Sequence, residues 1–217
     1  MKIPLVSILY GINAIILFFF SFRLFLAYRK SLNPLSRYFR NMSFFSGIGM
    51  AIYSGMTFLF PKNSFALGVG NILGEIFFYL TFIYGLSMFF YSINSGISQR
   101  KIFFFGIIAL IFAIAIHIIF FPSPFIDEKG ILHFNNHFWV GIIYHLFAIF
   151  GLWPLGFLFS WQAITKKEIR KRSILLATAI WMISLLAPLF FDKGKTIEGF
   201  FLQTLGFIFL FWGALIK

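Results

Sequence analysis

Three ionisable side chains lie inside long apolar stretches of this sequence. Counting along a helix at about 1.5 Å per residue places Glu75 roughly 15 Å and His145 roughly 12 Å from the ends of their stretches. His117 lies nearer to the end of a third stretch. Because ionisable groups are costly in a hydrocarbon core, each of the three is a candidate functional residue.

The chemistry open to these residues is proton exchange, ligand anchoring or hydrogen bonding between helices. A lone carboxyl in lipid can stay protonated, since desolvation disfavours the charged form, and can then donate to a neighbour. Glu75 is therefore either a ligand or proton site or a structural link. For His145 the favoured interpretation is a neutral imidazole bonded between helices, and for His117 it is a residue without a functional role.

Neutral polar side chains recur at similar depths in several stretches, and they include Tyr10, Tyr144 and Thr204. Asn71 and Glu75 are four residues apart and so share one helix face. Because buried polar groups must find partners, such a cluster predicts a cavity in the outer half of a helix bundle. With Glu75 as its anchor, the predicted ligand site contains Asn71, His145, Asn13, Tyr53, His117 and Gln203.

Metal and cofactor chemistry is poorly supported. His133 and His137 have the spacing of two metal ligands if that segment were helical, but no third ligand is specified. Haem would need two inward histidines at one depth, and the depths of His117 and His145 differ. The chain has no cysteine, and no nucleophile–base pair is recognisable. We predict no metal, no cofactor and no enzymatic activity.

The elements that must position these residues are membrane-spanning helices. Of 217 residues, 60% are hydrophobic and only 11% are charged, which excludes a soluble globular domain. The apolar stretches are long enough to cross a bilayer and are apolar on all faces. We predict an all-α polytopic membrane protein, a single domain over 1–217, with seven spans at 4–27, 42–60, 66–92, 102–121, 137–160, 173–191 and 199–216.

The cations are divided unevenly between the connections. The first, third and fifth connections hold most of them, and the others hold Lys62, Lys129, Lys193 and Lys195. The positive-inside rule predicts an outer N-terminus and a cytoplasmic Lys217. The expected location is a bacterial cytoplasmic membrane. A formal net charge of +12 thus indicates anionic lipid headgroups and not nucleic acid. The predicted lipid or signalling-partner surface is Lys166, Lys167, Arg170, Lys171 and Arg172.

The longest connection, residues 122–136, is predicted to lie outside. Its Asp127 to Gly130 segment is a turn signal and predicts a short hairpin over the outer mouth of the bundle. Pro154 and Pro188 interrupt two spans, where each frees a backbone carbonyl and can kink its helix.

Two family resemblances bear on function. Residues 59–63 and 190–194 are loosely alike, so the first and last three spans resemble the parallel repeats of SWEET-type sugar transporters. Segments at 36–40, 127–130, 138–139, 144–145 and 170–173 resemble the seven-helix membrane sensor region of bacterial histidine kinases. That resemblance implies ligand sensing in the outer half, without catalysis, because no kinase module follows Lys217.

The function expected from these observations is that of a receptor-like membrane sensor for a small ligand. A small-solute transporter is the first alternative, and a structural or assembly protein is the second. The expected contacts are the bilayer, anionic headgroups, the ligand and a cytoplasmic signalling protein.

Overall fold

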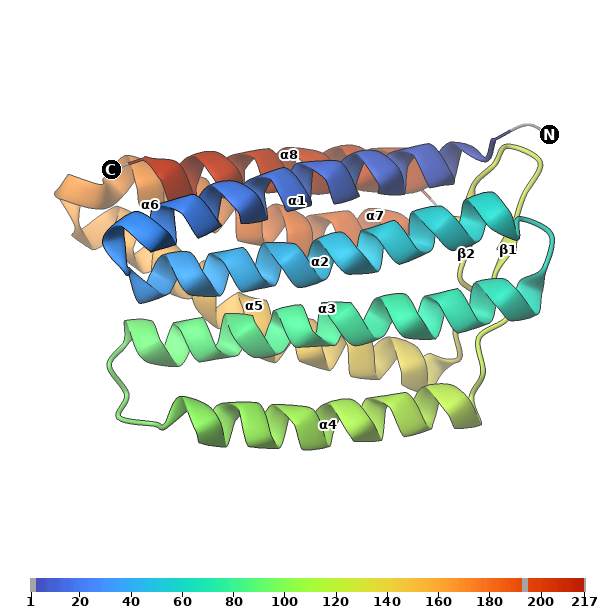
Figure 1. Ribbon diagram of the computed structural model, residues 1–217, viewed down its shortest axis with the longest axis horizontal. Helices are drawn as coiled ribbons and strands as arrows, with labels where there is room; N and C mark the ends of the chain where they lie inside the picture. Colours follow the sequence, from blue (N-terminus) through green and yellow to red (C-terminus); the bar gives the residue numbers. More distant parts are fainter. Residues whose placement is uncertain (1–2, 193–194, 217) are drawn as a thin grey trace.

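A computed structural model describes residues 3–192 and 195–216 as an α-helical bundle with one small hairpin (Figure 1). Lys193, Gly194 and Lys217, which entered the sequence argument, lie outside the described residues. Within the described part, seven helical spans are long and apolar enough to cross a membrane. They are α1 (Leu5–Ser31), α2 (Pro34–Leu59), α3 (Ser64–Ser92), α4 (Gln99–Ile119), α5 (Phe138–Thr165), the composite sixth span (Lys167–Phe191) and α8 (Thr196–Leu215).

Several helices extend beyond the predicted spans. The largest difference is at α2, which begins at Pro34 and not at residue 42. Asn33 caps this helix by accepting a hydrogen bond from the Leu35 amide at 3.0 Å, and Pro34 occupies the first helical position, where its missing N–H costs nothing. The basic first turns of α2 therefore stay helical although their sequence is more polar than the rest of the span.

The helices form a ring around an interior. α1, α2, α3, α5, α6 and α8 each pack on the next, and α8 returns to α1. α4 lies outside this ring against α3 and α5, as Figure 1 shows, and it is the least buried of the seven spans. The crossing of α3 and α5 is close because a side chain at Gly85 would overlap the carbonyl oxygen of Gly151. Small residues at such crossings let helix backbones approach in membranes.

The sixth span is not a continuous α-helix. It consists of a 3₁₀ turn (Lys167–Ile169), α6 (Arg170–Trp181), a π-helical segment (Met182–Leu186) and α7 (Ala187–Asp192). The Ala187 amide donates to the Met182 carbonyl oxygen, five residues back. Pro188 follows directly and cannot donate a backbone hydrogen bond, which accounts for an irregularity at this place. By contrast, α5 continues through Pro154.

The predicted hairpin is confirmed. β1 (Phe125–Ile126) pairs antiparallel with β2 (Leu132–His133). In the turn, Asp127 Oδ1 accepts from the Lys129 and Ile131 amides, each at 2.9 Å, and Gly130 has a positive φ of 77°. The Val6 amide donates to the Gly130 carbonyl oxygen at 3.0 Å, so the hairpin is fastened to the start of α1. It lies at the end of the bundle where α1 begins (Figure 1); we call this the hairpin end.

Basic residues gather at the opposite end. That end holds the end of α1, the start of α2, the α3–α4 connection and the start of the sixth span (Figure 1). α1 begins at the hairpin end and α8 ends at the opposite end, as seven crossings require. The charge asymmetry is thus a property of the folded bundle, whereas the membrane side that each end faces stays a prediction.

Candidate functional site

A cavity of about 770 Å³ occupies the hairpin half of the bundle interior. Its walls come from α1, α2, α3, α5, α7, α8 and the π segment, and the hairpin and the segment after it border its mouth. Of the predicted site residues, those that line it are Tyr53, Glu75, His145 and Gln203. His117, Asn71 and Asn13 lie behind the wall, where each bonds to another element.

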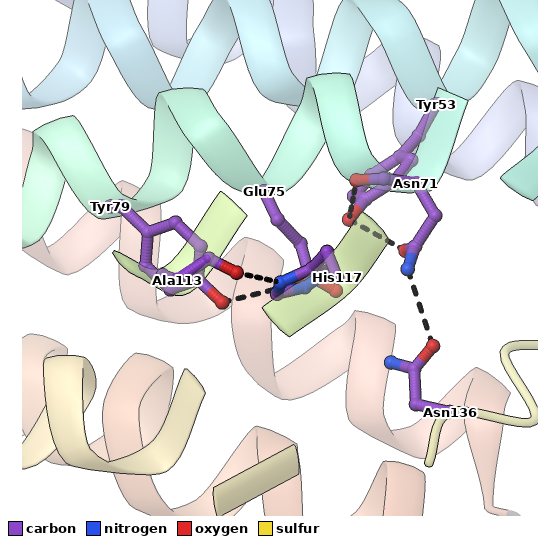
Figure 2. A network of polar contacts seen from close by, with 7 residues as sticks. All are labelled: Tyr53, Asn71, Glu75, Tyr79, Ala113, His117 and Asn136. Atoms are coloured by element: carbon purple, nitrogen blue, oxygen red, sulfur yellow. Dashed lines mark hydrogen bonds and ion pairs between the residues drawn. The ribbon is translucent and has the colours of Figure 1, made fainter. Parts of the chain in front are cut away.

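The centre of the wall is a hydrogen-bonded group around Glu75 (Figure 2). Glu75 Oε2 accepts from the Tyr79 hydroxyl at 3.0 Å and lies 2.5 Å from His117 Nε2. Both partners of this contact are almost fully buried, with 4% of Glu75 and 1% of His117 exposed. His117 Nδ1 lies 2.8 Å from the Ala113 carbonyl oxygen, one turn back in α4. The group therefore joins α4 to α3 inside the apolar bundle.

The geometry fixes the number of protons in this pair. A carbonyl oxygen only accepts, so His117 Nδ1 carries a hydrogen toward Ala113. A short contact between Nε2 and Oε2 needs one more hydrogen, since both atoms otherwise present lone pairs. That proton belongs either to a neutral carboxylic acid beside a neutral imidazole or to an imidazolium beside a carboxylate. In both forms the pair is neutral, which is the state that burial favours.

The predicted depth of His117 was wrong, since His117 lies level with Glu75. His117 was placed shallower than Glu75 because it is near the end of its own span. However, α4 stops short of the end of α3 at the hairpin side, as Figure 1 shows. Helix ends in one bundle do not share a level, so distance from a helix end is a poor measure of depth. Tyr79 was not predicted, although its spacing four residues after Glu75 was a usable signal.

Asn71 links three parts of the chain near the mouth. Tyr53 donates its hydroxyl to Asn71 Oδ1 at 3.1 Å, and Asn71 Nδ2 donates to Asn136 Oδ1 at 3.2 Å (Figure 2). Because Tyr53 and Asn136 both line the cavity, Asn71 positions lining residues from behind. Asn136 was not predicted, since nothing in its local sequence separates it from an ordinary loop asparagine.

Asn13 likewise acts between helices. The Thr204 hydroxyl of α8 lies 2.7 Å from Asn13 Oδ1 of α1. Within the described part of the chain, neither Asn13 Nδ2 nor the buried Oε1 of Gln203 has a hydrogen-bond partner. The contact between α1 and α8 thus contains one hydrogen-bond donor and one acceptor, both beside the cavity, that no described residue pairs with.

The cavity ends near the middle of the bundle. Its deepest polar residues on α2 and α3 are Ser46 and Thr81, whose hydroxyl oxygens are 3.0 Å apart. Ser184 of the π segment also lines it, which brings the irregular part of the sixth span to the wall. These three residues were not predicted, because short hydroxyl side chains give little signal in an apolar helix.

The histidines near the mouth do not form the helical metal pair considered from the sequence. His133 belongs to β2 and lies 3.1 Å from Asp127 Oδ2, while the His137 ring stacks on Phe120. Among the described residues, no group of three or more His, Asp or Glu side chains could hold a metal ion. Hydrogen bonds from the Ile131 amide, then His133 and the Lys129 amide, hold the pKa of the Asp127 carboxyl below its usual range.

The predicted basic surface lies far from this site, at the opposite end. Lys166, Lys167, Arg170 and Lys171 are exposed and Arg172 is half-buried. They surround the 3₁₀ turn and the first turn of α6. Their exposure is compatible with contacts to headgroups or to a partner protein.

Fold and cavity together define a class, a polytopic seven-helix membrane protein with a largely apolar cavity that has a few polar groups in its wall, in one half of its bundle. Comparison of the chain with protein-family models, curated proteins and solved structures gives no match. Neither the histidine-kinase sensor resemblance nor the SWEET resemblance therefore gains support from a relative.

Proposed function

We propose that this protein is a receptor-like membrane sensor that binds a small ligand in the cavity. The observation that carries the proposal is a cavity of about 770 Å³ with the buried carboxyl group of Glu75 in its wall. Small-molecule sites typically measure about 300–1,000 Å³ and combine an apolar lining with a few polar groups. An intramembrane carboxyl is the polar group least expected without a role.

The extent of the cavity favours binding over passage. It opens toward the hairpin end and stops at the level of Ser46 and Thr81. A ligand entering past the hairpin would be held there between the ring helices. The apolar part of the lining suits a ligand with a hydrophobic body and a polar group that reaches Glu75.

The sixth span offers a route for output. Ile183 and Ser184 of its π segment line the cavity, and its other end carries Lys167 and Arg170. π segments are weak points of helix regularity and often occur at functional sites. A ligand that alters the π segment would move the basic end of the same span, where a cytoplasmic signalling protein or anionic headgroups would respond.

One observation favours the alternative, a small-solute transporter. The wall includes a helix interrupted at the π segment and Pro188. Interrupted helices beside a site near the bilayer midplane are typical of transporters. A transporter would move its solute across proteoliposome membranes, whereas a sensor would bind it without flux. A structural or assembly role predicts neither.

Native mass spectrometry with matched glycine variants tests the proposal. Gly141 and Gly55 both have open space around the position of a new side chain, but only Gly141 lines the cavity. We expect the wild-type protein and Gly55→Phe to release a stoichiometric small molecule on activation, and Gly141→Phe to release none. Release of phospholipids alone from all three proteins would contradict the proposal. If the released molecule crosses the membrane of proteoliposomes that contain the protein, the protein is a transporter and not a sensor.

A further inference from the structure

The side of Glu75 that does not face His117 is available to a ligand. Its hydrogen bonds to Tyr79 and His117 both use Oε2, so neither of these two contacts engages Oε1. Glu75 also lines the cavity. The carboxyl group thus serves the buried pair through Oε2 and also borders the cavity.

The rest of the lining suits a cation. The chain has 18 Lys and Arg residues, yet within the described part none of them lines the cavity. The lining instead contains tyrosine and phenylalanine rings, among them Tyr10, Tyr53, Phe134 and Tyr144. Aromatic faces attract cations through their quadrupole, and a carboxylate forms strong charge-assisted hydrogen bonds with an ammonium group.

We propose that the ligand is a protonated amine with an apolar body, and that its binding displaces the proton shared by Glu75 and His117. This inference rests on the proposed ligand-binding function of the cavity. The ammonium group would bind at Oε1, and the proton between Oε2 and Nε2 would leave through the cavity to water. The pair then carries one negative charge and the ligand one positive charge. Exchange therefore keeps the site neutral, whereas adding a cation to an already neutral pair would bury an uncompensated charge.

The surroundings of Glu75 are compatible with this exchange. Ionisable side chains that interact electrostatically with Glu75 come from α1, α2, α3, α4 and α5. Those five are Tyr10, Tyr53, Tyr79, His117 and Tyr144. The lining residue Gln203 of α8 is neutral. Tyrosine hydroxyls are neutral near pH 8 and contribute dipoles only. Because His133, His137 and His145 line the same cavity, proton exchange is best measured above about pH 7.5.

Proton loss would also change how α4 is held. Without the shared proton, the imidazole keeps a single hydrogen, which cannot serve both the Ala113 carbonyl oxygen and Glu75 Oε2, so one of the two contacts of His117 is lost. In the described part of the chain, α4 has no other side-chain hydrogen bond to a neighbouring helix. Amine binding would therefore weaken how His117 holds α4, and α4 is released from α3 where the hydrogen stays on Nδ1.

The test compares an amine with an uncharged analogue of the same shape. The probes are 2-(2-naphthyl)ethylamine and 2-(2-naphthyl)ethanol, measured by isothermal titration calorimetry in two buffers of different ionisation enthalpy. The proteins are wild type, Glu75→Gln and the control Glu128→Gln, which makes the same chemical change at an exposed turn residue that does not line the cavity.

For wild type and Glu128→Gln we expect the amine to bind at least tenfold more tightly than the alcohol and to release about one proton. The amine Kd should fall about tenfold per pH unit between roughly pH 7.5 and 8.5, the slope of one exchanged proton. Glu75→Gln should bind both probes alike and release no proton. If Glu75→Gln does not fold, the number of protons released by the wild-type protein and the pH dependence of its amine Kd still test the proposal.

Each remaining outcome contradicts one of the two proposals. Binding of the alcohol as tight as that of the amine, or amine binding without proton release, overturns the inference and leaves the cavity as a ligand site. Binding of neither probe overturns the inference. If the chain then also releases only phospholipids in native mass spectrometry, the proposed function fails with it.

Discussion

His117 Nε2 and Glu75 Oε2 are 2.5 Å apart, and both side chains are almost fully buried in the bundle. α4, which lies outside the ring, is tied to α3 by this contact. A hydrogen bond of this kind costs much when one partner is removed and little when both are replaced by apolar groups. The pair can therefore be a proton site and a structural link at once, and the two roles respond differently to substitution.

The first prediction concerns this asymmetry. His117→Leu should lower the free energy of unfolding by about 3 kcal/mol, because Glu75 is left buried with only the Tyr79 hydroxyl as partner. The double variant Glu75→Leu/His117→Leu should recover most of that loss. Unfolding in mixed micelles by denaturing detergent measures both. Tyr79→Phe, which removes one hydrogen bond, should cost only about 1 kcal/mol. Additive losses in the double variant would show that the two side chains are not coupled.

The second prediction concerns the crossing of α3 and α5. A methyl group at Gly85 would overlap the Gly151 carbonyl oxygen, and backbone cannot move aside as a flexible side chain can. We expect Gly85→Ala to destabilise the bundle by about 1–3 kcal/mol through overpacking. Gly55→Ala is the control, since the space around Gly55 is open. It should be neutral or slightly stabilising, because alanine is the better helix former. Equal melting temperatures for the two variants would contradict the close crossing.

The third prediction concerns pH and the hairpin. The pKa of Asp127 is held below its ordinary value of 3.8, so its carboxylate stabilises the turn at every pH above that value. This contribution is lost as the pH falls through the lowered pKa, since a neutral carboxyl oxygen is a weaker acceptor for the Lys129 and Ile131 amides than a carboxylate oxygen. Hydrogen exchange at these two amides, corrected for intrinsic rate, should accelerate below about pH 3.8. Asp127→Ala should exchange fast at neutral pH, and Glu128→Ala should resemble wild type.

Sequence reasoning located the helices because their signal is summed over many residues. Seven spans and the hairpin followed from apolar length and from the turn residues Asp127 to Gly130, and both are confirmed. The predicted start of α2 was too late. Asn33 caps the helix, which therefore begins ahead of residues that looked too polar for a membrane span. The π segment was missed too, since Pro188 indicates that regularity is broken but not how the backbone adjusts.

The candidate site was predictable in kind but not in arrangement. Glu75, Tyr53, His145 and Gln203 do line one cavity, as a cluster of polar residues predicted. Which residues face the cavity and which stand behind it depends on helix rotation and relative shift. Uniformly apolar helices carry almost no amphipathic signal from which rotation could be inferred. The contact between Glu75 and His117 depended on the shift of α4 along α3, which no local pattern encodes.

The last prediction concerns orientation in the membrane. The positive-inside rule assigns the hairpin end to the outside and the basic end to the cytoplasm. Because the chain contains no cysteine, a single introduced cysteine reports its own position. Lys129→Cys in the hairpin turn and Lys167→Cys at the basic end are both at exposed positions. A membrane-impermeant maleimide should label Lys129→Cys in intact cells and Lys167→Cys only after the membrane is opened. The reverse labelling would invert the topology and place the mouth of the cavity toward the cytoplasm.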